Sequence, residues 1–121
     1  NMPFKAILKN LVEKTPGATG AILLDWEGEA VADFSKVPDM DMPAIGAHKG
    51  IILNLARDAM LNIKQANGVK TIAISTERAG VALSTIKEGY YLVVTVEKNK
   101  PFGMVFFESK KAIKDIEKEM G

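Results

Sequence analysis

Apolar residues recur along this chain at two spacings, and these spacings predict the order of its helices and strands. Between residues 3 and 14 they follow the three- and four-residue steps of one helical face, with Phe4, Leu8 and Leu11 among them. Pro16 and Gly17 end this predicted helix, because a residue before proline avoids the helical region of backbone space.

Shorter runs rich in β-branched residues predict five strands. Between the first two, the turn at Trp26 and Glu27 ends on Gly28, which supplies the positive φ that hairpin turns need. The last three are separated by short links that contain glycine, and short links predict antiparallel neighbours. The predicted strands are residues 21–25, 29–34, 69–75, 81–86 and 90–97.

Two further segments predict helices. The first covers 42–66, with Asp41 at its N-cap and the stop signal Asn67-Gly68 after its end. The second covers 101–120, and its apolar face is formed by Phe102, Phe106, Ile113, Ile116 and Met120. The predicted order is α-β-β-α-β-β-β-α in one α+β domain over residues 1–121, a five-stranded antiparallel sheet with helices on both faces.

The predicted central helix has more apolar surface than one sheet covers. About 25 residues give a length of about 37 Å, whereas strands of this size span roughly 20–26 Å. Its apolar arc covers about 200°, twice what a one-sided surface helix needs. A second copy packed about a two-fold axis would bury the excess. The alternative is a helix covered by loops of its own chain, and it predicts a monomer.

The helical wheel separates two functional surfaces on this predicted helix. One flank beside the stripe that faces the sheet is expected to contact the second copy, through His48, Ile51, Leu55, Ala59 and Asn62. The polar arc contains a single apolar residue and is the candidate docking face for a partner protein. Its residues are Asn54, Arg57, Asp58, Leu61 and Lys64.

Composition narrows the function classes. The chain has 121 residues, 16 basic and 15 acidic, for a net charge of +1, which predicts neither a nucleic-acid surface nor a membrane surface. It has no cysteine, so disulfides and thiolate metal sites are excluded, and a cytoplasmic location fits. No apolar run approaches the roughly 20 residues that span a bilayer.

Residues that carry chemistry are few, and the sequence predicts no enzyme, cofactor or metal. The only histidine, His48, has no nucleophile or acid that would complete a catalytic set. Asp39 and Asp41 lack the ligand spacing of a calcium loop, and helix capping explains them better. Arg57 and Arg78 fit solvated surface charge better than an arginine finger. Trp26 either anchors a partner or folds back over the sheet edge, and the sequence leaves both open.

Several segments in this order resemble the Roadblock/dynein light-chain family, and most closely its bacterial MglB-like members. Residues 7–18 resemble the family's opening helix and its exit. Residues 20–28 resemble its first hairpin, where an acidic residue precedes a glycine turn, and residues 89–94 resemble its last strand. The resemblance extends over essentially the whole chain.

The resemblance implies a profilin-like three-layer fold and a homodimer. The central helices of two copies would pair, and the third strand would pair edge to edge with its mate through Lys70, Thr71, Ile72, Ala73 and Ile74. It also implies binding of a Ras-like small GTPase of the MglA type and modulation of its nucleotide cycle without donated catalytic residues. A small-molecule sensory module of similar layered shape is the alternative.

Overall fold

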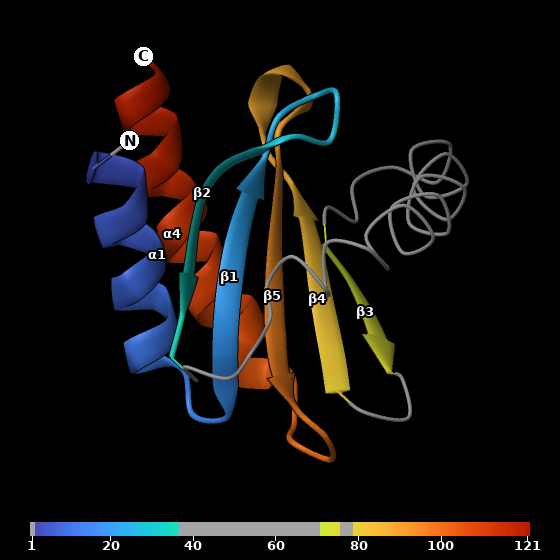
Figure 1. Cartoon of the computed structure of the whole chain (residues 1–121). Coiled ribbons are helices and arrows are strands. Elements are labelled where there is room, and N and C mark those ends of the chain that lie inside the picture. Colours follow the sequence, from blue (N-terminus) through green and yellow to red (C-terminus); the bar gives the residue numbers. More distant parts are fainter. Residues whose placement is uncertain (1, 37–70, 76–78) are drawn as a thin grey trace.

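The computed structural model describes residues 2–36, 71–75 and 79–121 (Figure 1). In these ranges the chain forms helices α1 (Met2–Lys14) and α4 (Gly103–Met120) and a short 3-10 turn, η1 (Lys87–Gly89). The strands are β1 (Ala18–Leu24), β2 (Ala30–Ser35), β3 (Thr71–Ser75), β4 (Ala79–Thr85) and β5 (Tyr91–Glu97).

The expected fold class, with its five-stranded antiparallel sheet and its first and last helices, is confirmed. Two strands begin a few residues earlier than predicted: β1 begins at Ala18 rather than at residue 21, and β4 begins at Ala79 rather than at residue 81. The helix expected over 42–66, with residues 69 and 70 of the third predicted strand, lies outside the described residues. The described order is therefore α-β-β-β-β-β-α, not the predicted order of eight elements.

The strands lie in the order β2-β1-β5-β4-β3, and every neighbouring pair is antiparallel (Figure 1). Strands β3, β4 and β5 form the expected meander, because few residues separate Ser75 from Ala79 and Thr85 from Tyr91. Strand β1 then pairs with the free side of β5. Because β1 lies between β2 and β5, the outermost strands of the sheet are β2 and β3.

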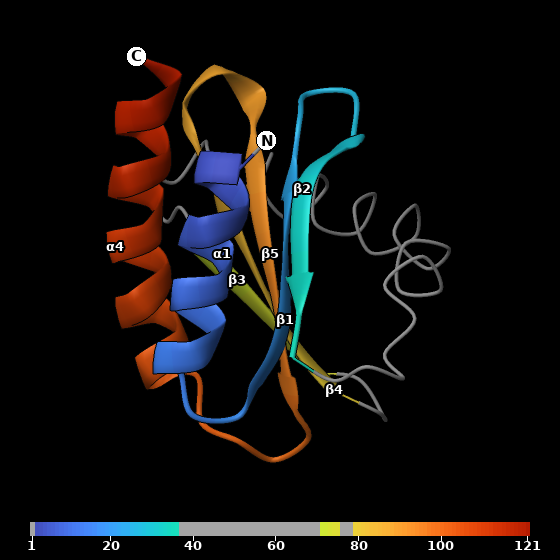
Figure 2. The ribbon, with the colours of Figure 1, turned by 60° about the vertical axis from the view of Figure 1, so that its left-hand side comes forward.

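Both described helices lie on one face of the sheet (Figure 2). Their buried side chains meet a row of strand residues that includes Ala21, Val94 and Ala82, which lie opposite one another in register. Helix α1 contributes Phe4, Leu8, Leu11 and Val12, and α4 contributes Val105, Ala112 and Ile116.

The apolar face predicted for the last helix was partly wrong. Ile116 is fully buried, but Phe106 is 40% exposed, and the buried centre of the face includes Val105 and Ala112. The difference arises because α1 packs against one side of α4, an arrangement that helical periodicity alone does not specify. Phe106 instead stacks on Phe102, with ring centroids 5.9 Å apart.

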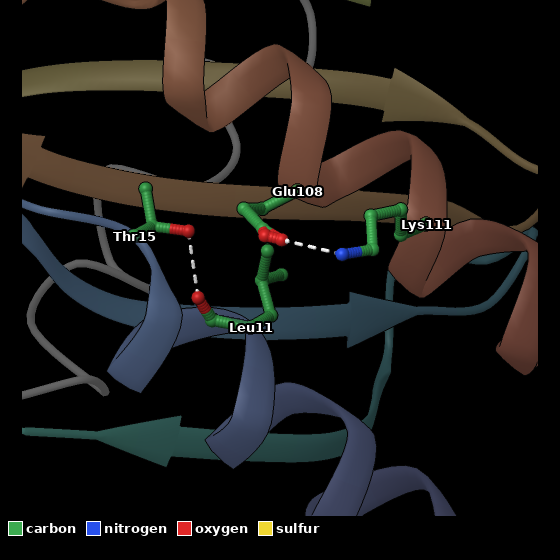
Figure 3. A network of polar contacts seen from close by, with 4 residues as sticks. All are labelled: Leu11, Thr15, Glu108 and Lys111. Atoms are coloured by element: carbon green, nitrogen blue, oxygen red, sulfur yellow. Dashed lines mark hydrogen bonds and ion pairs between the residues drawn. The ribbon is translucent and has the colours of Figure 1, made fainter.

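Polar contacts lie at the end of α1 and in the middle of α4 (Figure 3). The buried Thr15 hydroxyl donates to the carbonyl of Leu11 at 2.7 Å and so satisfies an oxygen of the last turn of α1. On α4 the carboxylate of Glu108 is almost entirely buried and pairs with Lys111 at 3.2 Å. In Figure 3 the Leu11 side chain of α1 points toward the Glu108 carboxylate of α4, whereas the side chain of Lys111 is 56% exposed.

Gly80 is required where α4 starts above the sheet. A Cβ atom at this position would lie 2.7 Å from the Phe102 ring and 2.7 Å from Val96 Cγ2. Both distances are shorter than van der Waals contact, so the aromatic ring packs directly on the bare backbone of β4.

Gly80→Ala is expected to lower the free energy of unfolding by about 1–3 kcal/mol, because the added methyl group overpacks the contact with Phe102 and Val96. Urea unfolding of both proteins measures the change. Gly103→Ala is the matched control, since a Cβ there meets nothing within 4 Å. Equal stability of the two variants would contradict the role assigned to Gly80.

Candidate interaction surface

The β3 strand presents an edge suited to pairing with another strand. Thr71–Ser75 contains no charged residue and no proline, which are the residues that usually block strand addition at a sheet edge. Within the part of the chain that the structure describes, β3 pairs with β4 alone. An uncharged edge of this kind is expected to be covered by a partner strand.

The register between β3 and β4 keeps this edge regular. All five residues of β3 have partners on β4, from Thr71 opposite Ser84 to Ser75 opposite Gly80, with no bulge between them. The hydroxyls of Thr71 and Ser84 hydrogen-bond at 2.9 Å and tie the two strands together at one end. Since bulges are a common means of protecting edges, their absence here leaves the edge open to pairing.

The opposite edge of the sheet is different. Strand β2 pairs with β1 through a register shift between Leu23 and Leu24, and its middle carries the exposed charge of Asp33. Helix α1 packs along β1 and β2, with Phe34 against the core (Figure 2). A charge and a bulge both disfavour strand addition, so β3 is the better candidate for assembly.

The face of the sheet away from α1 and α4 is also apolar. The register places Ile22, Val93 and Leu83 in one row across it, and β3 extends that row with Ile72. The buried apolar residues on this face are Ile22, Leu24, Val81, Leu83 and Val93. A sheet face of this composition requires a covering layer, which is the role predicted for the central helix.

The predicted site residues fall into two groups. Thr71, Ile72, Ala73 and Ile74 lie on β3 at the sheet edge, where Ala73 is exposed and the other three are half-buried. Ile72 and Ile74 point to the apolar face, and Ala73 to the face that carries the helices. The others lie outside the described residues: His48, Asn54, Ile51, Leu55, Arg57, Asp58, Ala59, Leu61, Asn62, Lys64 and Lys70.

Chemistry-bearing groups are sparse in the part that the structure describes. No three residues among His, Cys, Asp and Glu gather there in a way that would hold a metal ion. No helix among residues 2–36 and 79–121 is long and apolar enough to cross a membrane. Asp39, Asp41 and His48 lie outside the described ranges.

Sequence reasoning could not place Trp26, and the structure brings it against Tyr90. The two rings meet edge to face with centroids 5.7 Å apart, while Trp26 remains 58% exposed. The ring therefore folds back onto the β4–β5 connection, and anchoring of a partner by its exposed part stays a prediction. The only feature of the sequence that pointed to this contact was an aromatic residue beside each of two predicted turns.

Residues 5–95 match the family model described as Roadblock/LC7 domain. No curated protein matches the chain by sequence.

Three solved structures share its fold at low sequence identity. A Roadblock/LC7 domain from Streptomyces avermitilis is 19% identical with a TM-score of 0.75, and the match covers 96% of each chain. The gliding protein MglB from Thermus thermophilus is 20% identical with a TM-score of 0.78, covering 94% of this chain and 85% of that one. An MglB with a tetrameric arrangement is 20% identical with a TM-score of 0.75, covering 93% and 86%.

Proposed function

Because the chain belongs to the Roadblock/LC7 domain family, we propose that it is a non-catalytic dimeric regulator or scaffold that binds a Ras-like small GTPase of the MglA type. The observation that carries the proposal is the uncharged outer strand β3, next to a sheet whose second face is apolar. Likeness in fold to two solved structures of MglB supports the choice of partner.

In the proposed dimer, β3 pairs with its counterpart and joins the two sheets. Antiparallel pairing about a two-fold axis at the middle of β3 places Ala73 near its own mate. The small side chains of Thr71, Ala73 and Ser75 allow close approach on the face that carries the helices. Backbone groups of β3 that pair with no other described strand would gain hydrogen bonds at this edge.

The apolar second face supports the other half of the assembly. We propose that residues 42–66 cover it and pair with their counterparts through His48, Ile51, Leu55, Ala59 and Asn62. This arrangement would satisfy both the apolar sheet face and the excess apolar surface that the helix pattern predicts. It would also bring two copies of the proposed docking face together as one platform.

The platform would act on the GTPase by preferential binding. A partner that binds one conformation of the switch regions more tightly than the other shifts their equilibrium by that difference in affinity. Asn54, Arg57, Asp58, Leu61 and Lys64 are the residues proposed to make this contact. Donated catalytic groups are not required, because a shift in population is sufficient to change the nucleotide cycle.

Leu61→Glu is expected to weaken binding of the GTPase about tenfold or more, because it introduces a charge into an apolar contact on the docking face. Isothermal titration of the purified GTPase, loaded with a non-hydrolysable GTP analogue, measures the affinity. Light scattering of the same variant should still show a dimer. Unchanged affinity would exclude this surface, and loss of the dimer would place Leu61 in the assembly contact instead.

A further inference from the structure

Two turns at one end of the sheet bring an exposed tryptophan against a second aromatic ring. The β1–β2 turn carries Trp26, and the β4–β5 connection, which contains η1, leads to Tyr90 (Figure 1). Trp26 is 58% exposed although its ring touches Tyr90. We call residues 25–29 together with residues 87–90 the aromatic tip.

The aromatic tip is acidic. It contains Asp25, Glu27, Glu29 and Glu88 against a single basic residue, Lys87. The ammonium of Lys87 donates to the carbonyl oxygen of Gly121 at 3.1 Å. The side chains of Glu27, Glu29 and Glu88 are exposed and make no hydrogen bond or ion pair in the described part of the chain.

The first turn is held rigidly by its own backbone and by Asp25. The Asp25 carboxylate oxygen Oδ1 accepts the backbone N–H groups of Glu27 at 2.9 Å and of Glu29 at 3.0 Å. The carbonyl of Asp25 also accepts the N–H of Gly28, which has a φ of +81°. Asp25 is therefore occupied with the turn, whereas the neighbouring glutamates and Trp26 face outward.

The second turn carries a glutamate, Glu88, at a backbone position that does not favour this residue type. Glu88 has a φ of +62° and Gly89 a φ of +81°. Asparagine or glycine suits the first of these positions better than glutamate, which pays a steric cost there. Gly89 lies against Trp26, since a Cβ added to it would be 3.1 Å from Trp26 Cβ. Glu88, whose side chain is exposed, thus directly precedes the glycine that contacts the tryptophan.

We propose that the aromatic tip docks a basic segment of a partner protein, with an arginine or lysine side chain over the exposed ring of Trp26. Tryptophan is the most favourable aromatic partner for such a cation. The exposed carboxylates of Glu27, Glu29 and Glu88 on the same two turns complement the remaining positive charge of the segment. Rigid turns make the surface preorganised, so little conformational entropy is lost on binding.

This surface is separate from the proposed dimer contact. The tip lies where β1 joins β2 and β4 joins β5, whereas the pairing edge is the outer side of β3. A dimer formed through β3 would carry two such tips. Binding at the tip therefore does not require the dimer, and a monomeric variant would retain it.

The test uses the purified full chain and a short peptide of alternating arginine and serine at low ionic strength. Trp26 is the only tryptophan in the chain, so its fluorescence reports on this surface alone. We expect a saturable change in Trp26 emission with this peptide. The same peptide with glutamine in place of arginine should produce none.

Variants separate a specific contact from general attraction between charges. Affinity, measured by anisotropy of a labelled peptide, should fall about fivefold in Trp26→Ala and about fivefold in the double variant Glu27→Gln with Glu88→Asn. Glu88→Asn also relieves the unfavourable φ, so binding should weaken without loss of thermal stability. The matched control, Glu13→Gln with Glu97→Gln, removes the same charge at the opposite end of the sheet and should leave the affinity unchanged.

Two results would overturn the proposal. Equal losses in the tip variant and the matched control would mean that only net charge attracts the peptide. Equal binding of the glutamine peptide would mean that the cation is not recognised. Neither result would bear on the dimer, whose test is the molecular mass of the protein in solution.

Discussion

Leu23→Ala is expected to lower the free energy of unfolding by about 2–5 kcal/mol, the range for truncating a fully buried leucine. Leu23 lies in β1, between β2 and β5, and has no exposed surface. Its side chain belongs to the core shared with Leu8 and Leu11 of α1. Because domains of this size have a total stability of roughly 5–15 kcal/mol, the loss would be a large part of it.

Chemical denaturation in urea, followed by far-ultraviolet circular dichroism, measures this effect. Phe107→Ala removes a larger apolar side chain from a position that is 58% exposed on α4 and serves as the control. Its expected effect is under about 1 kcal/mol, since most of the ring already contacts water. A loss of stability in Phe107→Ala that matched Leu23→Ala would contradict the assignment of the core to the space between the sheet and the two described helices.

Ala73→Lys is expected to convert the proposed dimer into a monomer. Ala73 is the middle residue of β3 and is exposed on the strand that forms the sheet edge. Pairing about a two-fold axis would bring two lysines together, and juxtaposed like charges cost several kcal/mol, which raises the dissociation constant by about a hundredfold or more. Size-exclusion chromatography with light scattering over a dilution series measures the change in mass.

Ala30→Lys provides a matched control for this experiment. Ala30 is also an exposed alanine on an outermost strand, but it lies on β2 at the other edge. The same change in volume and charge there should leave the dimer intact. A wild-type protein that is monomeric at all concentrations would refute the proposed assembly, and dissociation by both variants would point to general charge repulsion.

Of the first and last helices, α1 and α4, the buried face of α1 was the more predictable. The pattern around Phe4, Leu8 and Leu11 identified its buried face, since all three side chains lie in the core. In α4 the same reasoning overestimated the burial of Phe106, whose side chain is 40% exposed. The neighbouring elements decide which residues of a wide apolar arc face the core and which face solvent.

The candidate site was predictable to a smaller extent. Apolar residues in 69–75 identified a strand. That β3 is an outermost strand follows only from the tertiary structure, in which β1 pairs with β5 rather than with β3. Its role in pairing came from resemblance to a family rather than from the residues themselves. The aromatic tip could not be predicted, because Trp26 and Tyr90 are far apart in sequence and meet only through the pairing of β1 with β5.

The sequence by itself determined the local elements of this protein. Alternation of apolar residues, the glycine turn at Gly28 and the stop at Pro16 act over a few residues, so their outcome is settled within the segment that contains them. The tertiary structure decided which described strands became outermost in the sheet, which aromatic rings met and which face of the sheet the first and last helices cover. These features depend on contacts between distant segments, and several such arrangements satisfy the same local pattern.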